Sequence, residues 1–287
     1  MESHSARRDT DTGSVEWNPV RQLLGCRGYE FILLTLNQPI RDASLFKQLW
    51  KSAEIKIAAD GGANRIYDLS RESPPENRDG SPGPEPSERF KDLDTIIGDL
   101  DSLTDSARSY FSRSRIILDP DQESTDFGKA VSLARRESPG RTVVAVGGLG
   151  GRVDQGLSQV HHLYLFQKSP TYADGRMYLL SGDSLSFILK GPGTHRIRVR
   201  EPGLEAEVEV EGKGDFFAKY VGVIPVGEPA VITTRGLEWD VKDWPTAFGG
   251  RISTSNHVLP ETEVVEVQTD KDVLFTIALK KGGEDVR

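Results

Sequence analysis

Acidic side chains are concentrated in three short segments, each at the end of an apolar run that predicts a strand. These are residues 59–65 (ADGGANR), 96–102 (IIGDLDS) and 119–129 (DPDQESTDFGK). If the backbone stays extended, Asp99 and Asp101 face the same way, and two close carboxylates repel unless a divalent cation offsets them. Mg²⁺ is normally held by one or two carboxylates together with substrate phosphates. The spacing therefore favours a magnesium site, with an ordinary acidic turn as the alternative.

Glycines provide a second signal beside these acids. Gly61 and Gly62 stand at a predicted strand-to-helix turn, where backbone N–H groups and the helix dipole favour an anion. Residues 147–155 (GGLGGRVDQ) carry four glycines before another helix, with Arg152 as a donor complementary to phosphate. The segment is neither a Walker A loop nor a GxGxxG dinucleotide fingerprint, so its glycines alone are a moderate signal.

Simpler roles exist for several of these residues. Asp60 is suited to capping a tight turn, and Thr125 or Asp126 is suited to capping the helix that follows. Capping needs one acidic residue, however, whereas residues 119–126 contain four acids in eight positions. Taken together, the four segments indicate a Mg²⁺–nucleotide site.

An alternation of strands and helices must position these segments. Strands are predicted at 31–36, 55–59, 95–97, 115–118, 143–146 and 177–180, with helical periodicity between them and Thr104 as one helix cap. This pattern predicts a Rossmann-like, doubly wound α/β domain over residues 28–180. In such a sheet, ligands bind beyond the carboxyl ends of the strands, so the four segments are expected to converge there.

The rest of the chain has a different character. Short apolar runs split by Gly and Pro, such as 185–189, 208–210, 221–224 and 273–279, predict an antiparallel β-sandwich or barrel over residues 181–287, and the sandwich is preferred. Residues 1–27 are expected to form a loosely ordered polar extension. Residues 71–89 contain five prolines and no large apolar side chain until Phe90, which predicts a disordered surface insertion.

Composition restricts the class of protein. The chain has 287 residues, a formal net charge of −8 and 36% hydrophobic residues, so it is globular, and general nucleic-acid or anionic-membrane binding is not expected. No apolar run is long enough for a membrane-spanning helix. Its single cysteine excludes an internal disulfide and suits a reducing compartment, and without a recognisable leader the expected location is cytoplasmic.

At these residues the chain resembles thiamine pyrophosphokinase (thiamine diphosphokinase) of the eukaryotic type. The similar stretches are LNQP from Leu36, ADGGANRIYD from Ala59, GDLDS from Gly98, DPDQESTDFGKA from Asp119, GGLGGRVDQ from Gly147, GVIPVGEP from Gly222, TTRGLEWD from Thr233 and STSNHV from Ser253. They occur in order over about residues 30–280. The departures are the N-terminal extension, the Pro-rich insertion and extra length near residues 200–219, none of which touches a motif.

The resemblance implies transfer of diphosphate from the co-substrate ATP to the hydroxyethyl group of thiamine, giving thiamine diphosphate and AMP. It further implies Mg²⁺ and a homodimer whose active site lies between the α/β domain of one subunit and the sandwich of the other.

The resemblance also assigns residues. The metal site corresponds to Asp60, Asp99 and Asp101, and these with Asp126 and Arg152 are the catalytic candidates; Asp101 is one candidate for accepting the hydroxyl proton. The ATP and phosphate candidates are Gly61, Gly62, Asn64, Gln122, Thr125, Gly147, Gly148, Arg152, Asp154 and Gln155. The thiamine candidates are Trp239, Ser253, Ser255 and Asn256. Without the resemblance, Trp239 would be interpreted as a core aromatic and the three polar residues as turn or strand positions.

The sequence has three rival functional interpretations. A Rossmann oxidoreductase requires a glycine fingerprint after the first strand, where this chain has residues 36–39 (LNQP). A serine hydrolase of the α/β type requires a GxSxG elbow, which is absent from the sequence. A non-catalytic thiamine- or nucleotide-binding protein remains the alternative to the enzyme.

Overall fold

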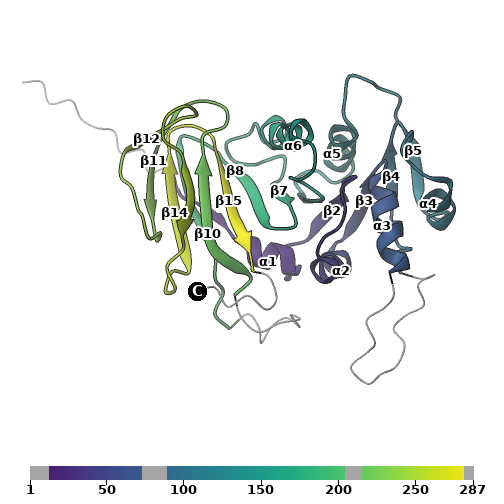
Figure 1. Cartoon of the computed structure of the whole chain (residues 1–287), viewed down its shortest axis with the longest axis horizontal. Coiled ribbons are helices and arrows are strands. Elements are labelled where there is room, and N and C mark those ends of the chain that lie inside the picture. Colours follow the sequence, from purple (N-terminus) through teal and green to yellow (C-terminus); the bar gives the residue numbers. More distant parts are fainter. Residues whose placement is uncertain (1–12, 73–88, 204–214, 281–287) are drawn as a thin grey trace, which may run out of the picture.

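The computed structural model describes residues 13–72, 89–203 and 215–280. Figure 1 shows an elongated molecule with helices and strands at one end and a sandwich of strands at the other. These are the two parts that the sequence predicts, so the predicted fold class is confirmed. The predicted insertion at 71–89 lies almost wholly in residues 73–88, which are outside the described parts of the chain.

Six parallel strands form the sheet of the α/β half, in the spatial order β7-β6-β2-β3-β4-β5. Their bounds are β2 Phe31–Thr35, β3 Ile55–Ala59, β4 Thr95–Gly98, β5 Arg115–Leu118, β6 Thr142–Val146 and β7 Met177–Leu180. Strands β3, β4 and β5 lie in succession on one side of β2, whereas β6 and β7 lie on its other side. The direction therefore switches between β2 and β6, the place where open α/β sheets bind ligands.

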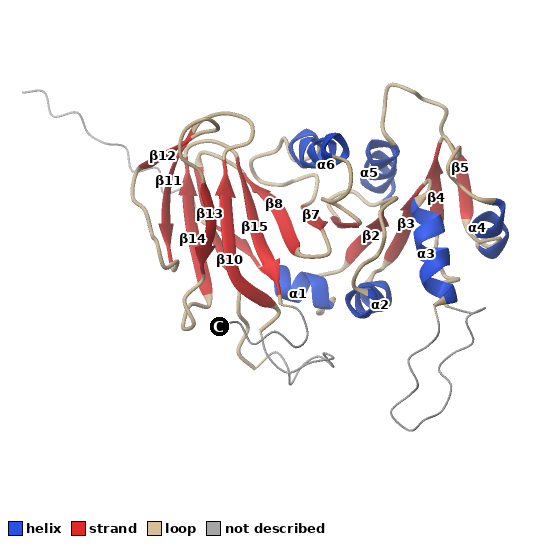
Figure 2. Ribbon diagram, viewed as in Figure 1, coloured by secondary structure: helices blue, strands red, loops and turns tan. Residues whose placement is uncertain are grey.

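Helices cover both faces of this sheet (Figure 2). Their bounds are α2 Ala43–Ser52, α3 Gly62–Arg71, α4 Asp105–Tyr110, α5 Asp126–Glu137 and α6 Val153–Leu165. Alternate residues of β2 enter different cores: Phe31 and Leu33 pack in the core shared with α2 and α3, whereas Ile32 and Leu34 pack with α5 and α6. Such two-sided burial is why the strand is a continuous apolar run.

The second half is a β-sandwich of antiparallel strand pairs. The strands are β8 Ser184–Leu189, β9 Gly193–Arg198, β10 Phe217–Ile224, β11 Ala230–Arg235, β12 Trp244–Thr246, β13 Ser253–His257, β14 Val264–Thr269 and β15 Val273–Leu279. One layer has the order β13-β10-β15-β8. It faces a second sheet in the order β1-β9-β14-β11-β12, in which β1 (Val15–Trp17) is parallel to β9. The strand expected at 208–210 lies outside the described residues.

One sheet runs through both halves of the molecule. Strand β8 pairs antiparallel with β7, so the first sandwich layer and the parallel sheet form a continuous ten-stranded sheet. The expected boundary at residues 180 and 181 thus falls between two hydrogen-bonded strands. We propose that 28–180 and 181–287 are functional divisions of one folding unit.

The N-terminal segment differs from the expected loose extension. Residues 15–24 form strand β1 (Val15–Trp17) and helix α1 (Pro19–Leu24), and β1 pairs in parallel with β9. The Trp17 side chain is fully buried, and its indole Nε1 donates a hydrogen bond to His195 Nδ1 at 3.1 Å. Its ring packs against Tyr172 and Phe187 at centroid distances of 4.9 and 4.5 Å. For residues 15–24 the prediction was wrong, because one buried tryptophan 178 residues from its partner produces no local periodicity. Residues 1–12 lie outside the described residues.

The described residues contain no helix with the length and apolar character needed to span a bilayer.

We predict that Trp17→Ala lowers the free energy of unfolding by about 3–5 kcal/mol, because it leaves a large cavity and an unpaired His195 nitrogen. Urea denaturation measures this change. The matched control is Trp239→Ala, whose side chain is 55% exposed and whose loss should cost about 0.5 kcal/mol or less. Similar losses in the two variants would contradict the anchoring role of Trp17.

Candidate active site

The loops after β2 to β6 converge at the carboxyl edge of the parallel sheet, as the strand pattern predicts. They surround a cavity of about 320 Å³. It is lined by Leu36, Asn37, Gln38, Ala59, Asp60, Gly61, Asp99, Ser102, Asp121, Gln122, Ser124, Thr125, Asp126, Phe127, Gln155, Ser158 and Gln159. The lining is mainly polar and brings together residues from the loops after β2, β3, β4 and β5 and from helices α5 and α6.

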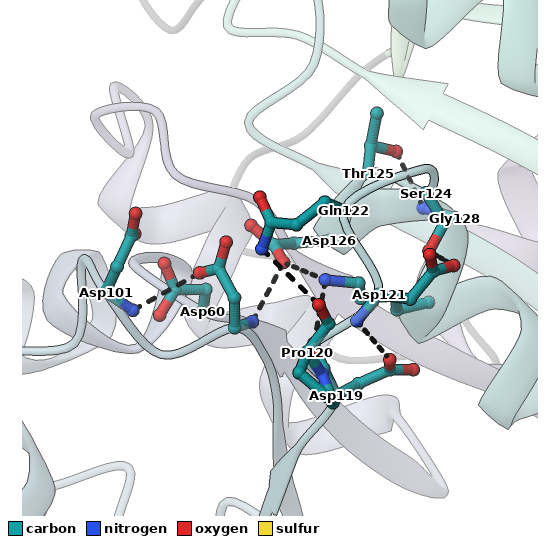
Figure 3. Close-up of polar contacts among 12 residues, drawn as sticks. Asp60, Asp101, Asp119, Pro120, Asp121, Gln122, Ser124, Thr125, Asp126 and Gly128 are labelled. Atoms are coloured by element: carbon teal, nitrogen blue, oxygen red, sulfur yellow. Dashed lines mark hydrogen bonds and ion pairs between the residues drawn. The ribbon is translucent and has the colours of Figure 1, made fainter.

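Three carboxylates form the acidic centre of this cavity. Asp60, Asp99 and Asp126 each offer an oxygen, and these oxygens all lie within 4.8 Å of one another. The residues follow β3, β4 and β5 respectively, with Asp126 at the start of α5. In Figure 3, Asp60 is seen between Asp101 on one side and Asp126 on the other.

Burial makes this cluster electrostatically unfavourable without a cation. Asp60 is 2% exposed, and its Oδ1 atom has no hydrogen-bond partner among the described residues, whereas Oδ2 accepts from the Ser102 N–H at 3.2 Å. Burial, and then repulsion from Asp126, raises the pKa of Asp60. Burial and repulsion from Asp99 likewise raise the pKa of Asp126. An unpaired buried oxygen among three carboxylates is the donor set that a hard cation such as Mg²⁺ requires.

Lys129 lies next to the acidic cluster, although the sequence predicted no role for it. Its side chain is buried, its Nζ lies 3.5 Å from Asp126 Oδ1, and it donates to the Asp119 carbonyl at 2.9 Å. A buried ammonium here partly offsets the negative charge of the cluster. Its spacing of three from Asp126 on a predicted helix was the available signal, because residues i and i+3 share a helix face.

Asp101 lies outside the three-carboxylate group. The extended backbone assumed for residues 99–101 does not occur, because Leu100 adopts a left-handed conformation with φ 63°. The Asp101 N–H instead donates to Asp99 Oδ1 at 3.2 Å, and its own carboxylate accepts from the Ser102 hydroxyl at 3.0 Å. Asp126 rather than Asp101 joins Asp60 and Asp99 in this group, and the assignment of Asp101 to the metal site stays a prediction.

Gly98 allows two of the carboxylates to approach the sheet. A Cβ atom at this position would lie 2.7 Å from Asp60 Cβ and 2.9 Å from Asp126 Oδ1. Asp60 itself has a positive φ of 40°, an unfavourable conformation for a non-glycine residue. Backbone strain of this kind persists where the surrounding structure enforces it, often at functional sites.

The predicted nucleotide residues divide into two groups. Gln122, Thr125 and Gln155 line the cavity, as does Gly61. Asn64 lies outside the lining and braces the acidic loop: its Nδ2 donates to the Ser102 carbonyl at 2.7 Å, and its Oδ1 accepts from the Thr104 N–H at 3.1 Å.

Close packing explains several of the glycines. A Cβ at Gly62 would lie 2.2 Å from the Thr35 carbonyl oxygen, and one at Gly148 would lie 2.6 Å from Leu179 Cδ1. Gly147 has a φ of 80° beside the Leu36 carbonyl. These glycines let the loops approach β2 and β7 closely, a requirement independent of any phosphate.

Arg152 and Asp154 form an exposed pair at the start of α6. The Arg152 Nη2 atom lies 2.5 Å from Asp154 Oδ2, and the two side chains are 74% and 60% exposed. Neither lines the cavity, although Gln155 and Ser158 on the following turn do. Arg152 is therefore close in sequence to the cavity wall but directed toward its own neighbour.

Trp239 and its neighbours lie in the sandwich and do not line this cavity. Trp239 is exposed, and its ring packs against His257 at a centroid distance of 4.9 Å. The Asn256 amide is buried and holds the Trp239 backbone, accepting from its N–H at 3.2 Å and donating to its carbonyl at 2.9 Å. Ser253 and Ser255 lie on β13, where Ser255 is exposed and has a φ of 55°.

Family models match both halves of the chain. Residues 46–173 match the thiamin pyrophosphokinase catalytic domain, and residues 194–274 match the thiamin pyrophosphokinase vitamin B1 binding domain. The first range contains the acidic cluster, and the second contains Trp239.

Curated proteins and solved structures agree with these matches. The chain is 36% identical over 265 residues to thiamine pyrophosphokinase 3 of Oryza sativa subsp. japonica, covering 88% of each chain. It is 35% identical over 270 residues to thiamine pyrophosphokinase 1 of Arabidopsis thaliana, covering 91% of this chain and 90% of the relative. The crystal structure of yeast thiamin pyrophosphokinase superposes with a TM-score of 0.75 at 25% identity, covering 95% and 93% of the two chains.

We predict that Asp60→Asn raises the melting temperature of the metal-free protein at pH 7. The pKa of Asp60 in the folded protein is raised above 3.8. Protonated Asp60 therefore adds to the free energy of unfolding below that pH, and this contribution is lost as the carboxylate ionises at higher pH. The amide carries no charge and retains an acceptor for the Ser102 N–H. Thermal unfolding in chelator measures the difference.

The same variant should lose the stabilisation that Mg²⁺ gives to the original chain. Asp101→Asn is the matched control and should keep it, because Asp101 lies outside the three-carboxylate group. Equal Mg²⁺-induced shifts for the original chain and Asp60→Asn would remove Asp60 from the metal site.

Proposed function

The chain belongs to the thiamine pyrophosphokinase family, and we infer that it is a thiamine diphosphokinase, which transfers diphosphate from ATP to thiamine to give thiamine diphosphate and AMP. The observation that carries this function is the group of three carboxylates in the cavity within the range that matches the catalytic domain. We propose that thiamine binds in the sandwich, which the match of residues 194–274 to the vitamin B1 binding domain supports. We further propose a cytoplasmic location, because the single cysteine suits a reducing compartment.

We propose that Asp60, Asp99 and Asp126 hold Mg²⁺. When bound, the cation would neutralise charge on the phosphate oxygens of ATP. The structural support is the orphaned Asp60 oxygen and the raised pKa of both Asp60 and Asp126.

In the reaction, the thiamine hydroxyl oxygen bonds to the β-phosphorus of ATP, and the bond from that phosphorus to the α,β-bridging oxygen breaks to release AMP. The protein chiefly has to position these groups and offset the negative charge. We propose that the buried Lys129 ammonium offsets negative charge from behind the acidic cluster. We also propose that the Arg152 side chain leaves its contact with Asp154 and binds the diphosphate. Gln122, Thr125 and Gln155 are proposed to surround the nucleotide, with Asp101 proposed as the acceptor of the hydroxyl proton.

We propose that Trp239 stacks on thiamine. Its exposed ring suits a cationic thiazolium or its attached pyrimidine, and cation–π attraction over Trp contributes roughly 0.5–2 kcal/mol. Asn256 acts indirectly here, because both of its amide atoms hold the Trp239 backbone. Ser253 and Ser255 are proposed to contact the polar groups of thiamine.

A homodimer would unite the two parts of the site. Within one chain, the acidic cavity lies at the carboxyl edge of the parallel sheet, whereas Trp239 adjoins His257 on β13. Strand β13 is an edge strand of the sandwich and is labelled in Figure 2. Exposed apolar side chains occur both in the sandwich half, at Phe248 and Ile252, and on α6, at Val153 and Leu157. We propose that the sandwich of one subunit faces the cavity of its partner.

The function is tested by incubating the purified protein with ATP, Mg²⁺ and thiamine and measuring AMP and thiamine diphosphate together. We expect the two products in equal amounts, and neither without thiamine or Mg²⁺. Formation of ADP and thiamine monophosphate would contradict diphosphate transfer. Thiamine-dependent thermal stabilisation without product would favour the non-catalytic binding protein.

Asp99→Asn and Asp126→Asn should each reduce kcat by about 100-fold or more with the fold preserved, because each removes charge from the proposed metal site. Steady-state kinetics and circular dichroism measure the two quantities. Asp101→Asn should reduce kcat without changing the apparent Mg²⁺ affinity. A normal rate in Asp126→Asn would exclude Asp126 from the metal site.

Complementation tests the shared site. Trp239→Ala should raise the KM for thiamine much more than that for ATP, so it is nearly inactive at low thiamine. Mixing it with Asp99→Asn under conditions that exchange subunits should restore roughly a quarter of the original activity, because half of the dimers then contain one intact site of two. No recovery despite demonstrated subunit exchange would contradict the shared site.

A further inference from the structure

His162 connects α6 to the start of α5 without lining the cavity itself. The residue is 5% exposed. Its Nδ1 atom lies 2.6 Å from the Ser158 carbonyl oxygen, and its Nε2 atom lies 2.8 Å from the Thr125 hydroxyl. Thr125 and Ser158 both line the cavity, from opposite helices. The imidazole thus joins two parts of the cavity wall that are 33 residues apart in sequence.

The direction of each hydrogen bond follows from its partners. A carbonyl oxygen only accepts, so Nδ1 carries the proton and donates to Ser158. Burial lowers the pKa of His162, which favours the neutral ring, so Nε2 accepts from the Thr125 hydroxyl. The same hydroxyl oxygen accepts from the Gly128 N–H at 3.0 Å, the capping bond of α5. The hydroxyl proton of Thr125 is therefore committed to His162.

Packing holds the ring in this place. It stacks on Phe127 with a centroid distance of 4.9 Å and an interplanar angle of 27°. Gly128 leaves room for it, since a Cβ there would lie 3.3 Å from Nε2. Phe127 lines the cavity and directly follows Asp126. The ring consequently contacts the residues on both sides of one carboxylate of the cluster.

We propose that His162 is a positioning residue for the nucleotide half of the site, acting through the Thr125 hydroxyl to hold the first turn of α5. This turn carries Asp126, whose distance from Asp60 and Asp99 determines whether the three carboxylates can act together on Mg²⁺-bound phosphates. The proposal rests on the proposed function, since it assigns His162 to the ATP rather than the thiamine part of that site. If His162 were merely structural, replacing it would lower the stability of the fold and change the KM values for ATP and thiamine equally.

The experiment compares His162→Leu, His162→Gln, Thr125→Val and the His162→Leu/Thr125→Val double variant. His162→Leu should raise the KM for ATP about tenfold, because it removes the hydrogen bond that holds Thr125 and the first turn of α5 in place. The KM for thiamine should stay within about twofold. His162→Gln should restore most of the ATP affinity, because its amide oxygen can accept from Thr125. The double variant should equal Thr125→Val, because valine already removes the hydrogen bond with His162 together with the cap on the Gly128 N–H.

His195→Leu is the matched control. His195 is also buried and makes two hydrogen bonds, to Trp17 and to the Lys190 carbonyl, but it lies in the sandwich region away from the cavity. The His195→Leu substitution should lower the melting temperature and leave the KM for ATP unchanged below that temperature. Equal effects of His162→Leu on both substrates, no rescue by glutamine, or additive losses in the double variant would each overturn the proposal.

A binding measurement separates this proposal from the proposed function. Calorimetry with α,β-methylene ATP and Mg²⁺, in the absence of thiamine, should show about tenfold weaker binding for His162→Leu than for the original chain. If the original chain binds this analogue but forms no thiamine diphosphate, the proposed function fails and the His162 comparison still stands. Equal dissociation constants for the two proteins would refute the role of His162 alone.

Discussion

Repulsion among three close carboxylates, one of them buried and two partly buried, is the constraint around which the α/β half is organised. Asp60, Asp99 and Asp126 would separate if their loops were free, but the ladder between β3 and β4 holds the first two side by side. Gly98 provides the space and Lys129 the nearby positive charge. The stability of the sheet therefore maintains an arrangement that electrostatics alone opposes, and a bound cation would relieve it.

The continuous ten-stranded sheet has a related consequence for the second half. Because β8 pairs directly with β7, the sandwich has a fixed place relative to the cavity. The buried Trp17 strengthens this connection, since β1 adds to one sandwich layer while α1 packs against α2. A chain built in this way holds Trp239 at a set distance from its own carboxylates, which is the physical basis for proposing that a second subunit completes the site.

Local sequence patterns predicted most of the described strands because those strands are buried on one or both faces. The strands at 55–59, 115–118 and 177–180 were predicted to the residue, and Thr104 caps α4 as expected. Strand β1 and helix α1 were missed because the partners of Trp17 are distant in sequence. The β13 strand was missed because its residues (STSNH) are polar and lie at a sheet edge, so they carry little apolar periodicity.

The sequence by itself determined the fold class, the family resemblance and the loops that form the cavity, because parallel strands bring all their carboxyl ends to one edge. Only the tertiary structure decided which side chains meet there. The left-handed Leu100 turns Asp101 away, and the first turn of α5 brings Asp126 in, with Lys129 behind it. Such choices depend on single backbone torsions and on contacts between distant segments, neither of which leaves a periodic signal in the residues themselves.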